Sequence, residues 1–307
     1  MVQENSISKN KILIICGPTA SGKTALAVEC AKMLNSEVIS ADSMNVYKDL
    51  NIGTAKPTEE EKQGIKHHLI DVVDAFSDFS VSDYKTLAEP IITSLLNDNK
   101  VPVICGGTGF YINSLLYDMS YGNSSANLIV REKYKKLAEE HGNEYVYEIL
   151  KEKDYKSAEK LHLNDLKRVI RALEIAESGV KKSDIKDELI AKYDYKAYSI
   201  NFTREELYER IGKRVDLMLE NGLIDEVGNL IKMGVTSKHQ CMQGIGYKEI
   251  YEYFMGNLSI DEAIELVKLN TRHYAKRQIT FFKRLNGLNL LSPNNVNILA
   301  SRIVNDL

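Results

Sequence analysis

The sequence predicts an α/β protein whose mainly parallel sheet is flanked by helices, because strand-like and helix-like segments alternate along it. An apolar run at 12–16 leads into the glycine-rich stretch GPTASGKT at 17–24, and residues typical of a helix follow. Further strand-like runs lie at 37–41, 101–105 and 196–202, and helical segments separate them. This order is typical of parallel strands joined by crossover helices, and the glycine-rich stretch makes the predicted core P-loop NTPase-like.

Residues 119–197 differ from the rest of the chain, because strand-like apolar runs give way to charge-rich helical segments. We interpret them as an all-helical insertion domain. Residues 1–118 and 198–307 then form the α/β core, which ends in a basic C-terminal helix. The predicted helices of the insertion lie at 128–140, 144–153 and 164–178.

The stretch GPTASGKT has the residues that a phosphate-binding loop requires between a strand and a helix. Gly17 and Gly22 permit backbone angles that a Cβ atom disfavours, so that amides can turn toward a phosphate. Lys23 would bring a positive charge to a terminal phosphate, and the Thr24 hydroxyl would reach a Mg²⁺ ion. The alternative is a glycine-rich turn before an ordinary helix. We therefore expect the chain to bind a di- or triphosphate.

Composition narrows the class of protein. The net charge of −3 argues against a general nucleic-acid coat protein, although a local basic face remains compatible with it. No apolar run approaches the ~20 residues of a membrane span, and residues 1–11 lack the apolar centre of a secretion signal. The four cysteines are scattered without a C-x-x-C pair, which favours a reducing, cytoplasmic compartment.

Asp42 directly follows the predicted strand at 37–41, at the sheet edge where the phosphate-binding loop would lie. A catalytic carboxylate and a turn-forming or N-cap aspartate are both compatible with this position. The strand at 101–105 ends in Gly106-Gly107-Thr108-Gly109 instead of a carboxylate, which disfavours a motor-type ATPase. Its glycines would let the backbone approach a ligand closely. The adjacent His67 and His68 lack a third metal ligand at a recognisable spacing.

Two helices carry basic residues of a kind that binds nucleic acid. Lys167 and Arg171 are four residues apart and therefore neighbours on one helix, although a solvated charged face would look the same. Capping boxes at Thr203 and Ser259 predict the starts of two later helices, the second reaching about residue 284. The last helix has a stripe of cations that suits a nucleic-acid backbone or a polyphosphate. This stripe consists of Lys268, Arg272, Lys276 and Lys283.

These stretches together resemble the bacterial tRNA dimethylallyltransferases, also called tRNA isopentenyltransferases. The resemblance covers nearly the whole chain and keeps the order of the family's motifs. The matching stretches are GPTASGKT at 17–24, ADSMNVYKDLNIGTAKP at 41–57, GGTGFYINSLL at 106–116, NDLKRVIRALE at 164–174, GLIDEV at 222–227, QGIGYKE at 243–249 and TRHYAKRQITFFKR at 271–284.

The resemblance implies transfer of a dimethylallyl group from dimethylallyl diphosphate to the exocyclic amine of an adenine. That adenine lies immediately 3′ of the anticodon in tRNAs that read codons beginning with U. By the same resemblance, Asp42 is the general base, while Lys23, Thr24, Arg214 and a Mg²⁺ ion at Thr24 assist the leaving diphosphate. The diphosphate would bind Gly17, Pro18, Thr19, Ala20, Ser21, Gly22, Lys23 and Thr24.

The implied partner is the anticodon stem-loop of tRNA, and a monomer without membrane attachment is expected. The implied contacts with tRNA are Asp42, Ser43, Met44, Asn45, Thr108, Arg131, Lys167, Arg168, Arg171, Gln243, Gly246, Lys248, Arg272, Lys276, Arg277, Gln278 and Lys283. Reversing the charge of Lys268 or Lys276 should weaken the salt dependence of tRNA binding. The family usually has Gln at the positions of Asn45 and Lys167, so substrate contacts differ locally.

Three other functions are compatible with parts of the sequence. A relative that prenylates AMP or ADP would share the core, but it needs neither the helical insertion nor the basic last helix. A nucleoside or nucleotide kinase would share the phosphate-binding loop and the following aspartate, and would transfer phosphate from ATP without tRNA. A tRNA-binding protein without catalytic activity would not require Asp42.

Overall fold

The computed structural model describes residues 10–117, 127–184 and 190–307. The chain forms two compact units. The first combines Met1–Leu116 with Ala191–Leu307, and the second is Tyr117–Ile190. Residues 194–197, expected in the insertion, thus belong to the first unit, where they begin a strand.

The first unit contains a six-stranded sheet in which all neighbouring strands are parallel, so the predicted α/β fold class is confirmed. The strand order is β3-β2-β4-β1-β5-β6. The strands are β1 (Lys11–Cys16), β2 (Val38–Ser40), β3 (His67–His68), β4 (Val103–Gly106), β5 (Asp194–Ile200) and β6 (Leu288–Leu291).

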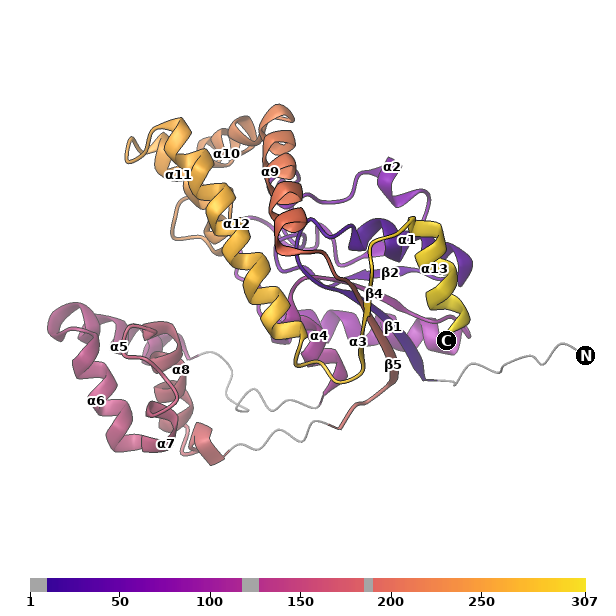
Figure 1. The fold of residues 1–307 in the computed structure, drawn as a ribbon. Coiled ribbons are helices and arrows are strands. Elements are labelled where there is room, and N and C mark those ends of the chain that lie inside the picture. Colours follow the sequence, from indigo (N-terminus) through magenta and orange to yellow (C-terminus); the bar gives the residue numbers. More distant parts are fainter. Residues whose placement is uncertain (1–9, 118–126, 185–189) are drawn as a thin grey trace, which may run out of the picture. The chain divides into compact units, whose positions relative to one another are not determined.

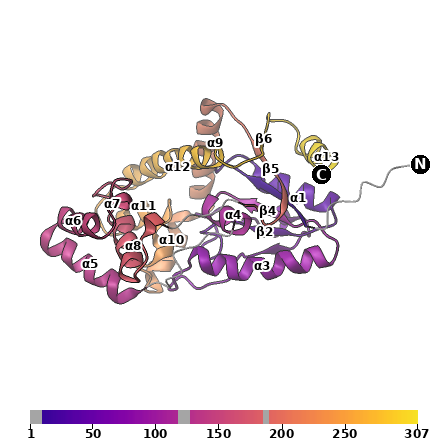
Figure 2. The ribbon, with the colours of Figure 1, turned by 90° about the horizontal axis from the view of Figure 1, so that it is seen from below.

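Helices cover both faces of this sheet (Figures 1 and 2). Alternate residues of a strand point to opposite faces, so Leu13 and Ile15 of β1 lie on the same face. They pack in one core cluster with α1 (Lys23–Met33) and α13 (Val296–Asn305). On the opposite face lie α3 (Val81–Asn97) and α4 (Gly109–Leu116), which contact each other.

Four further helices of the first unit contact one another in sequence order: α9 (Arg204–Glu220), α10 (Leu223–Lys232), α11 (Tyr247–Phe254) and α12 (Ile260–Phe282). The chain doubles back so that α12 lies beside α9 (Figure 1). The predicted capping boxes at Thr203 and Ser259 are both present, and they begin α9 and α12. Helices α9, α11 and α12 and the loops after β1 and β2 line a cavity.

The second unit is helical over its described residues and has its own apolar core, which includes Tyr134, Leu150 and Leu173. A strongly amphipathic α8 provides much of this core, because its apolar residues recur at helical spacing. The helices of this unit are α5 (Leu128–His141), α6 (Asn143–Lys153), α7 (Tyr155–Ala158), α8 (Leu166–Glu177) and the 3₁₀ turn η1 (Lys182–Asp184).

Two elements of the first unit have weak sequence signals. The edge strand β6 has only four residues and its middle residues are exposed, so its alternation is too short to detect. The strand-like run at 67–71 forms only the two-residue β3, because Leu69 and Asp71 adopt positive φ angles of 62° and 56°. The short helix α2 (Glu59–Lys62) lies in the same region and begins with a capping box at Thr58.

Candidate active site

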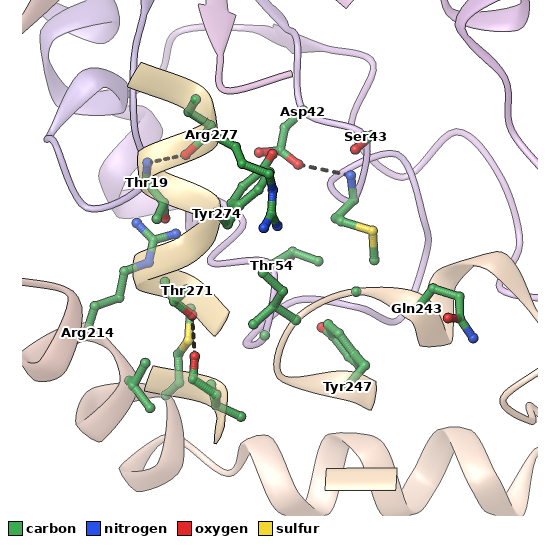
Figure 3. Close-up of a pocket in the computed structure, with 18 of the residues that line it drawn as sticks. Thr19, Asp42, Ser43, Thr54, Arg214, Gln243, Tyr247, Thr271, Tyr274 and Arg277 are labelled. Carbon is green, nitrogen blue, oxygen red and sulfur yellow. Dashed lines mark hydrogen bonds between the residues drawn. The ribbon is translucent and has the colours of Figure 1, made fainter. Parts of the chain in front are cut away.

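The main cavity has a volume of about 300 Å³ and lies where the loops after β1 and β2 meet α9, α11 and α12 (Figure 3). Polar groups line it beside the phosphate-binding loop, and apolar side chains line it beside α9 and α12. Its lining includes Thr19, Lys23, Asp42, Ser43, Met44, Thr54, Arg214, Val215, Met218, Gln243, Tyr247, Val267, Thr271, Tyr274, Arg277 and Gln278. A cavity of this size and composition is typical of a small-molecule site.

The loop at 17–24 has the backbone conformation of a strained phosphate-binding turn. Gly17 has a φ of 132°, and a Cβ there would lie 2.4 Å from Ser199 Oγ. Ala20 also has a positive φ, 61°, which is unfavourable for a residue with a Cβ. Arg210, which the sequence analysis did not select, donates from Nε to the Ala20 carbonyl at 2.7 Å and so stabilises this conformation.

Gln278 joins the phosphate-binding loop to the end of β4. Its Oε1 accepts a hydrogen bond from the Thr19 amide at 2.9 Å, and its Nε2 donates to the Gly107 carbonyl at 2.9 Å. Only 4% of the residue is exposed. Both ends of its amide are bound to the protein backbone, so Gln278 positions the loop. It also lines the main cavity, and its expected contact with tRNA stays a prediction.

Four charged residues line the cavity: Lys23, Asp42, Arg214 and Arg277. Burial and the nearby Arg214 lower the pKa of Lys23. Burial also lowers the pKa of Arg214, an effect that the negative charge of Asp42 partly offsets. Arg214 Nε is buried without a hydrogen-bond partner among the described residues. Its guanidinium extends from α9 toward Thr19 (Figure 3). Two concentrated cations at the loop create a site for an anion.

Asp42 lies at the carboxyl edge of the sheet, two residues after β2, and is partly exposed to the cavity. Its Oδ1 accepts a hydrogen bond from the Met44 amide at 2.9 Å, so the turn-forming interpretation also holds. Thr108 fixes the next residue, because its Oγ1 accepts from the Ser43 amide at 3.0 Å. A Cβ at Gly106 would lie 2.1 Å from the Ala41 carbonyl oxygen. The lack of a Cβ at Gly106 therefore permits close packing against this backbone, and Gly106 also lines a small pocket.

Glu226 on α10 fixes the loop that carries Thr54 into the cavity, a role that the sequence analysis missed. Its carboxylate accepts hydrogen bonds from three consecutive amides, those of Asn51, Ile52 and Gly53, at 2.8–3.1 Å. The buried Tyr247 hydroxyl donates to the same carboxylate at 2.5 Å. Glu226 lies in the GLIDEV stretch, but the loop amides that it binds lie more than 170 residues earlier in the sequence.

The residues expected to contact the target base occupy different places. Met44 and Gln243 line the main cavity, where Gln243 is exposed and its Nε2 donates to the Ser237 carbonyl at 2.5 Å. Asn45 is only 9% exposed and lines a smaller pocket, and its expected contact with tRNA stays a prediction. Gly246 caps α11 with a φ of 95°, and Lys248, two residues later, is exposed.

The basic residues of α12 differ in their surroundings. Lys276, Arg277 and Lys283 are exposed, and Arg277 lies over the Tyr274 ring at 5.7 Å and lines the cavity. Arg272 lies over the Tyr208 ring at 5.5 Å, and its Nε is buried without a hydrogen-bond partner in the described structure. Lys268 pairs with Asp216 of α9 at 2.8 Å, so the one-signed stripe on α12 has an acidic neighbour on another helix.

In the second unit, Arg131 and Arg171 bind the fully buried Glu174 side chain at 3.0 Å and 2.6 Å. Both arginines therefore also hold the helical core together. Arg168 pairs with Asp165 but is two-thirds exposed, and Lys167 is exposed. Burial and the charges of Arg168 and Arg171 lower the pKa of Lys182. Exposed cations such as Lys167 and Arg168 are of the kind that binds a polyanion.

The residues near the loop fit a Mg²⁺ ion bound together with a phosphate. Mg²⁺ prefers oxygen ligands and usually binds through few protein groups plus phosphates and water. Thr24 and Asp42 supply such oxygens to one small pocket. Within the described ranges, no cluster of three or more His, Cys, Asp or Glu residues could hold a metal by itself. His68 binds Glu37 at 2.6 Å, and His67 lies beside the small pocket.

None of the described helices is long and apolar enough to cross a membrane.

Over residues 45–285 the sequence matches the family described as IPP transferase. It is similar to the tRNA dimethylallyltransferase of Acetivibrio thermocellus, with 49% identity over 91% of this chain and 90% of that protein. It is also similar to that of Alkaliphilus oremlandii, with 46% identity over 97% of each chain.

Two solved structures have a similar fold. The tRNA isopentenylpyrophosphate transferase of Bacillus halodurans matches with a TM-score of 0.74 and 39% identity, over 97% of this chain and 95% of that chain. A eukaryotic dimethylallyltransferase acting on tRNA matches with a TM-score of 0.81 and 31% identity, over 94% of this chain and 75% of that chain.

Proposed function

The chain belongs to the IPP transferase family, and we propose from this that it transfers a dimethylallyl group from dimethylallyl diphosphate to tRNA. The acceptor is the exocyclic amine of the adenine immediately 3′ of the anticodon, in tRNAs that read codons beginning with U. Pyrophosphate is the second product. The observation that carries the proposal is one cavity that joins a phosphate-binding loop, a carboxylate and two cations.

The loop residues and the two cations bind the diphosphate and stabilise it as it leaves. Amides at the N-terminus of α1 are donors for phosphate oxygens. Lys23 and Arg214 face the same space and meet the negative charge that develops when the allylic C–O bond breaks. The apolar residues Val215, Met218 and Val267 accommodate the dimethylallyl group beside them.

Asp42 acts as the general base. The adenine amine is a weak nucleophile, because its lone pair is delocalised into the ring, so removal of a proton as the new C–N bond forms helps the reaction. Asp42 faces the cavity, and its Oδ1 is held by the Met44 amide. Tyr274 lines the same cavity, and burial and the Asp42 charge raise its pKa, so its hydroxyl stays protonated and can donate a hydrogen bond.

Thr24 would hold a Mg²⁺ ion with the diphosphate. The ion would supply charge neutralisation for the leaving group.

Exposed cations would bind phosphates of the anticodon stem-loop. They are Lys276 and Arg277 on α12, Lys283 directly after it, and Lys167 and Arg168 on α8. The adenine must leave its stack to enter the cavity, which costs less in a single-stranded loop.

We expect the protein to act in the cytoplasm as a monomer, without membrane attachment. All four cysteines are buried and free, as a reducing compartment would allow. Size-exclusion chromatography with light scattering measures the mass in solution directly. A dimer would contradict the expected monomer without affecting the proposed reaction.

One assay separates the proposed reaction from its alternatives. The protein and Mg²⁺ are incubated with labelled dimethylallyl diphosphate and either unmodified tRNA, AMP or buffer. We expect label in tRNA only. Label in AMP but not in tRNA would identify an adenylate prenyltransferase. Transfer of phosphate from ATP to a nucleoside or nucleotide, without prenylation, would identify a kinase, and tRNA binding without either transfer would identify a binding protein.

A further inference from the structure

A second, smaller pocket of about 40 Å³ adjoins the main cavity. The two share Lys23, Asp42, Thr54 and Arg214 in their linings. The small pocket is additionally lined by Thr24, Asn45 and His67. A water molecule needs about 10–15 Å³ of such space, so the pocket has room for a few waters.

Three polar atoms in the lining residues of this pocket are buried without a hydrogen-bond partner among the described residues. One is Oδ1 of Asn45, a residue that is only 9% exposed. The second is Nε2 of His67, and the third is Nε of Arg214. Buried polar groups in native proteins nearly always have a partner, so three unpaired atoms beside one pocket indicate a bound ligand.

Two of these atoms, Asn45 Oδ1 and His67 Nε2, are hydrogen-bond acceptors, whereas Arg214 Nε is a donor that suits the diphosphate. His67 Nδ1 lies 2.9 Å from the Ile65 carbonyl oxygen, which can only accept, so Nδ1 carries the proton. Burial lowers the pKa of His67 and keeps the ring neutral, which leaves a lone pair on Nε2. Asn45 Oδ1 is a carbonyl oxygen, and the Asp42 carboxylate, which lines the same pocket, also accepts. A group that binds Asn45 and His67 must therefore donate hydrogen bonds to both.

Water bound to a Mg²⁺ ion has this property. Mg²⁺ keeps several of its waters, which are polarised and donate strongly, and it prefers oxygen to imidazole nitrogen as a direct ligand. We propose that Asn45 and His67 accept hydrogen bonds from the waters of a Mg²⁺ ion that binds at Thr24 with the diphosphate. This inference rests on the proposed function. It assigns both residues a role in holding the metal, which for Asn45 replaces the expected contact with tRNA.

The test measures binding and does not depend on turnover. Pyrophosphate is titrated into the full-length protein by isothermal calorimetry at a series of Mg²⁺ concentrations and in EDTA. The wild-type protein should bind pyrophosphate more tightly as the Mg²⁺ concentration rises. The Mg²⁺ concentration that gives half of this increase is the midpoint. Asn45→Leu and His67→Leu should each raise that midpoint about 10-fold, since removing a partner of a metal's ligand costs about 10–100-fold in metal affinity. In EDTA, the pyrophosphate affinity of each variant should stay within about twofold of the wild-type value.

A matched control is His68→Leu, which removes the neighbouring histidine. His68 binds Glu37 and does not line the small pocket, so the Mg²⁺ midpoint should not move. An unchanged midpoint in both Asn45→Leu and His67→Leu would overturn the inference. So would an equal loss of pyrophosphate binding with and without Mg²⁺, because the residues would then act on the anion itself.

Asn45→Asp keeps the inference testable if the leucine variants do not fold. Aspartate has nearly the same shape and accepts at both oxygens, so the midpoint should stay equal or fall, and a raised midpoint would contradict the inference. The prenylation assay separates the two proposals. If wild-type protein prenylates tRNA but these variants leave the midpoint unchanged, only this inference fails. If tRNA is not prenylated but the midpoint shifts as expected, only the proposed function fails.

Discussion

The Glu226 carboxylate accepts a hydrogen bond from the Tyr247 hydroxyl at 2.5 Å while it also binds three consecutive backbone amides of the loop at 51–53. One side chain of α10 thus connects α11 to the loop that carries Thr54 into both pockets. A carboxylate is suited to this place because every neighbouring group in the set is a donor.

Glu226→Gln should therefore destabilise the fold, although the glutamate and glutamine side chains have nearly the same shape. Glutamine has one accepting oxygen, and its NH₂ group would face backbone amides that also donate. We expect a loss of ~1–3 kcal/mol in the free energy of unfolding, measured by urea denaturation, and a raised KM for both substrates. The control is Asp225→Asn on the adjacent, exposed residue, which should change neither quantity. Similar stability of the two variants would contradict the role of Glu226.

Gly53→Ala tests how closely this loop packs on Tyr247. A Cβ at residue 53 would lie 2.6 Å from the Tyr247 ring, which is almost fully buried. We expect ~1–3 kcal/mol of destabilisation in thermal or urea unfolding, the usual cost of overpacking. Gly212→Ala in α9 is the matched control, since a Cβ there meets nothing within 4 Å. It should stabilise by up to ~1 kcal/mol, because alanine is the better helix former.

The sequence predicted most of the fold, because the strands and helices that build it have strong local signals. Apolar runs located β1 and β4, and the capping boxes at Thr203 and Ser259 located α9 and α12. The strand β6 escaped detection, because its pairing with β5 depends on a partner more than ninety residues away.

The candidate site was predicted less completely, because sequence position does not show where a side chain points. Lys23, Asp42 and Arg214 meet in one cavity as expected. Gln278 and Asn45 lie in motifs that suggested tRNA contact, yet both are buried, one against backbone and the other beside the small pocket. Glu226 and Arg210 act on distant backbone groups, and no local pattern identifies such a partner.

Asp42→Asn separates the chemical role of Asp42 from its structural one. Asparagine Oδ1 can still accept from the Met44 amide, so the turn and the fold should persist. The amide cannot take a proton, and we expect kcat for tRNA prenylation to fall ~10²–10⁴-fold with little change in tRNA binding. Asp42→Ala should lose activity to a similar extent. An Asn variant that keeps more than about a tenth of wild-type kcat would contradict the general-base role.

The second unit should lose stability in acid through Glu174. Burial would raise the pKa of Glu174, but hydrogen bonds from Arg171 and Arg131 outweigh it and lower the pKa below its ordinary value of 4.5. Because the folded-state pKa lies below the unfolded-state pKa, the stabilisation is complete above about pH 4.5 and is lost as the pH falls through the folded-state pKa. Hydrogen exchange of peptides from 128–177, measured between pH 7 and pH 3, reports this loss after correction for the intrinsic exchange rate.

Glu174→Gln should remove most of this pH dependence and lower the stability of the unit at pH 7. Breaking a buried ion pair costs ~3–5 kcal/mol, and we expect the lower end, because the two arginine side chains remain 37% and 27% exposed to solvent. The control is Glu139→Gln on the exposed surface of α5, which should leave the exchange unchanged. Equal protection of wild type and Glu174→Gln at pH 7 would contradict this account.

Lys276 and Lys268 lie two turns apart on α12, and the structure distinguishes their contributions to tRNA binding. Lys276 is exposed and forms no ion pair with another described residue, whereas Lys268 is 19% exposed and bound to Asp216 at 2.8 Å. Both lysines were expected to affect the salt dependence of tRNA binding, but we now expect this effect only for Lys276. In filter-binding titrations, Lys276→Ala should reduce the slope of log K against log salt by about 1, as expected when one phosphate contact is lost. Lys268→Ala should leave that slope unchanged, and equal effects of the two variants would show that the Asp216 pair does not withhold Lys268 from tRNA.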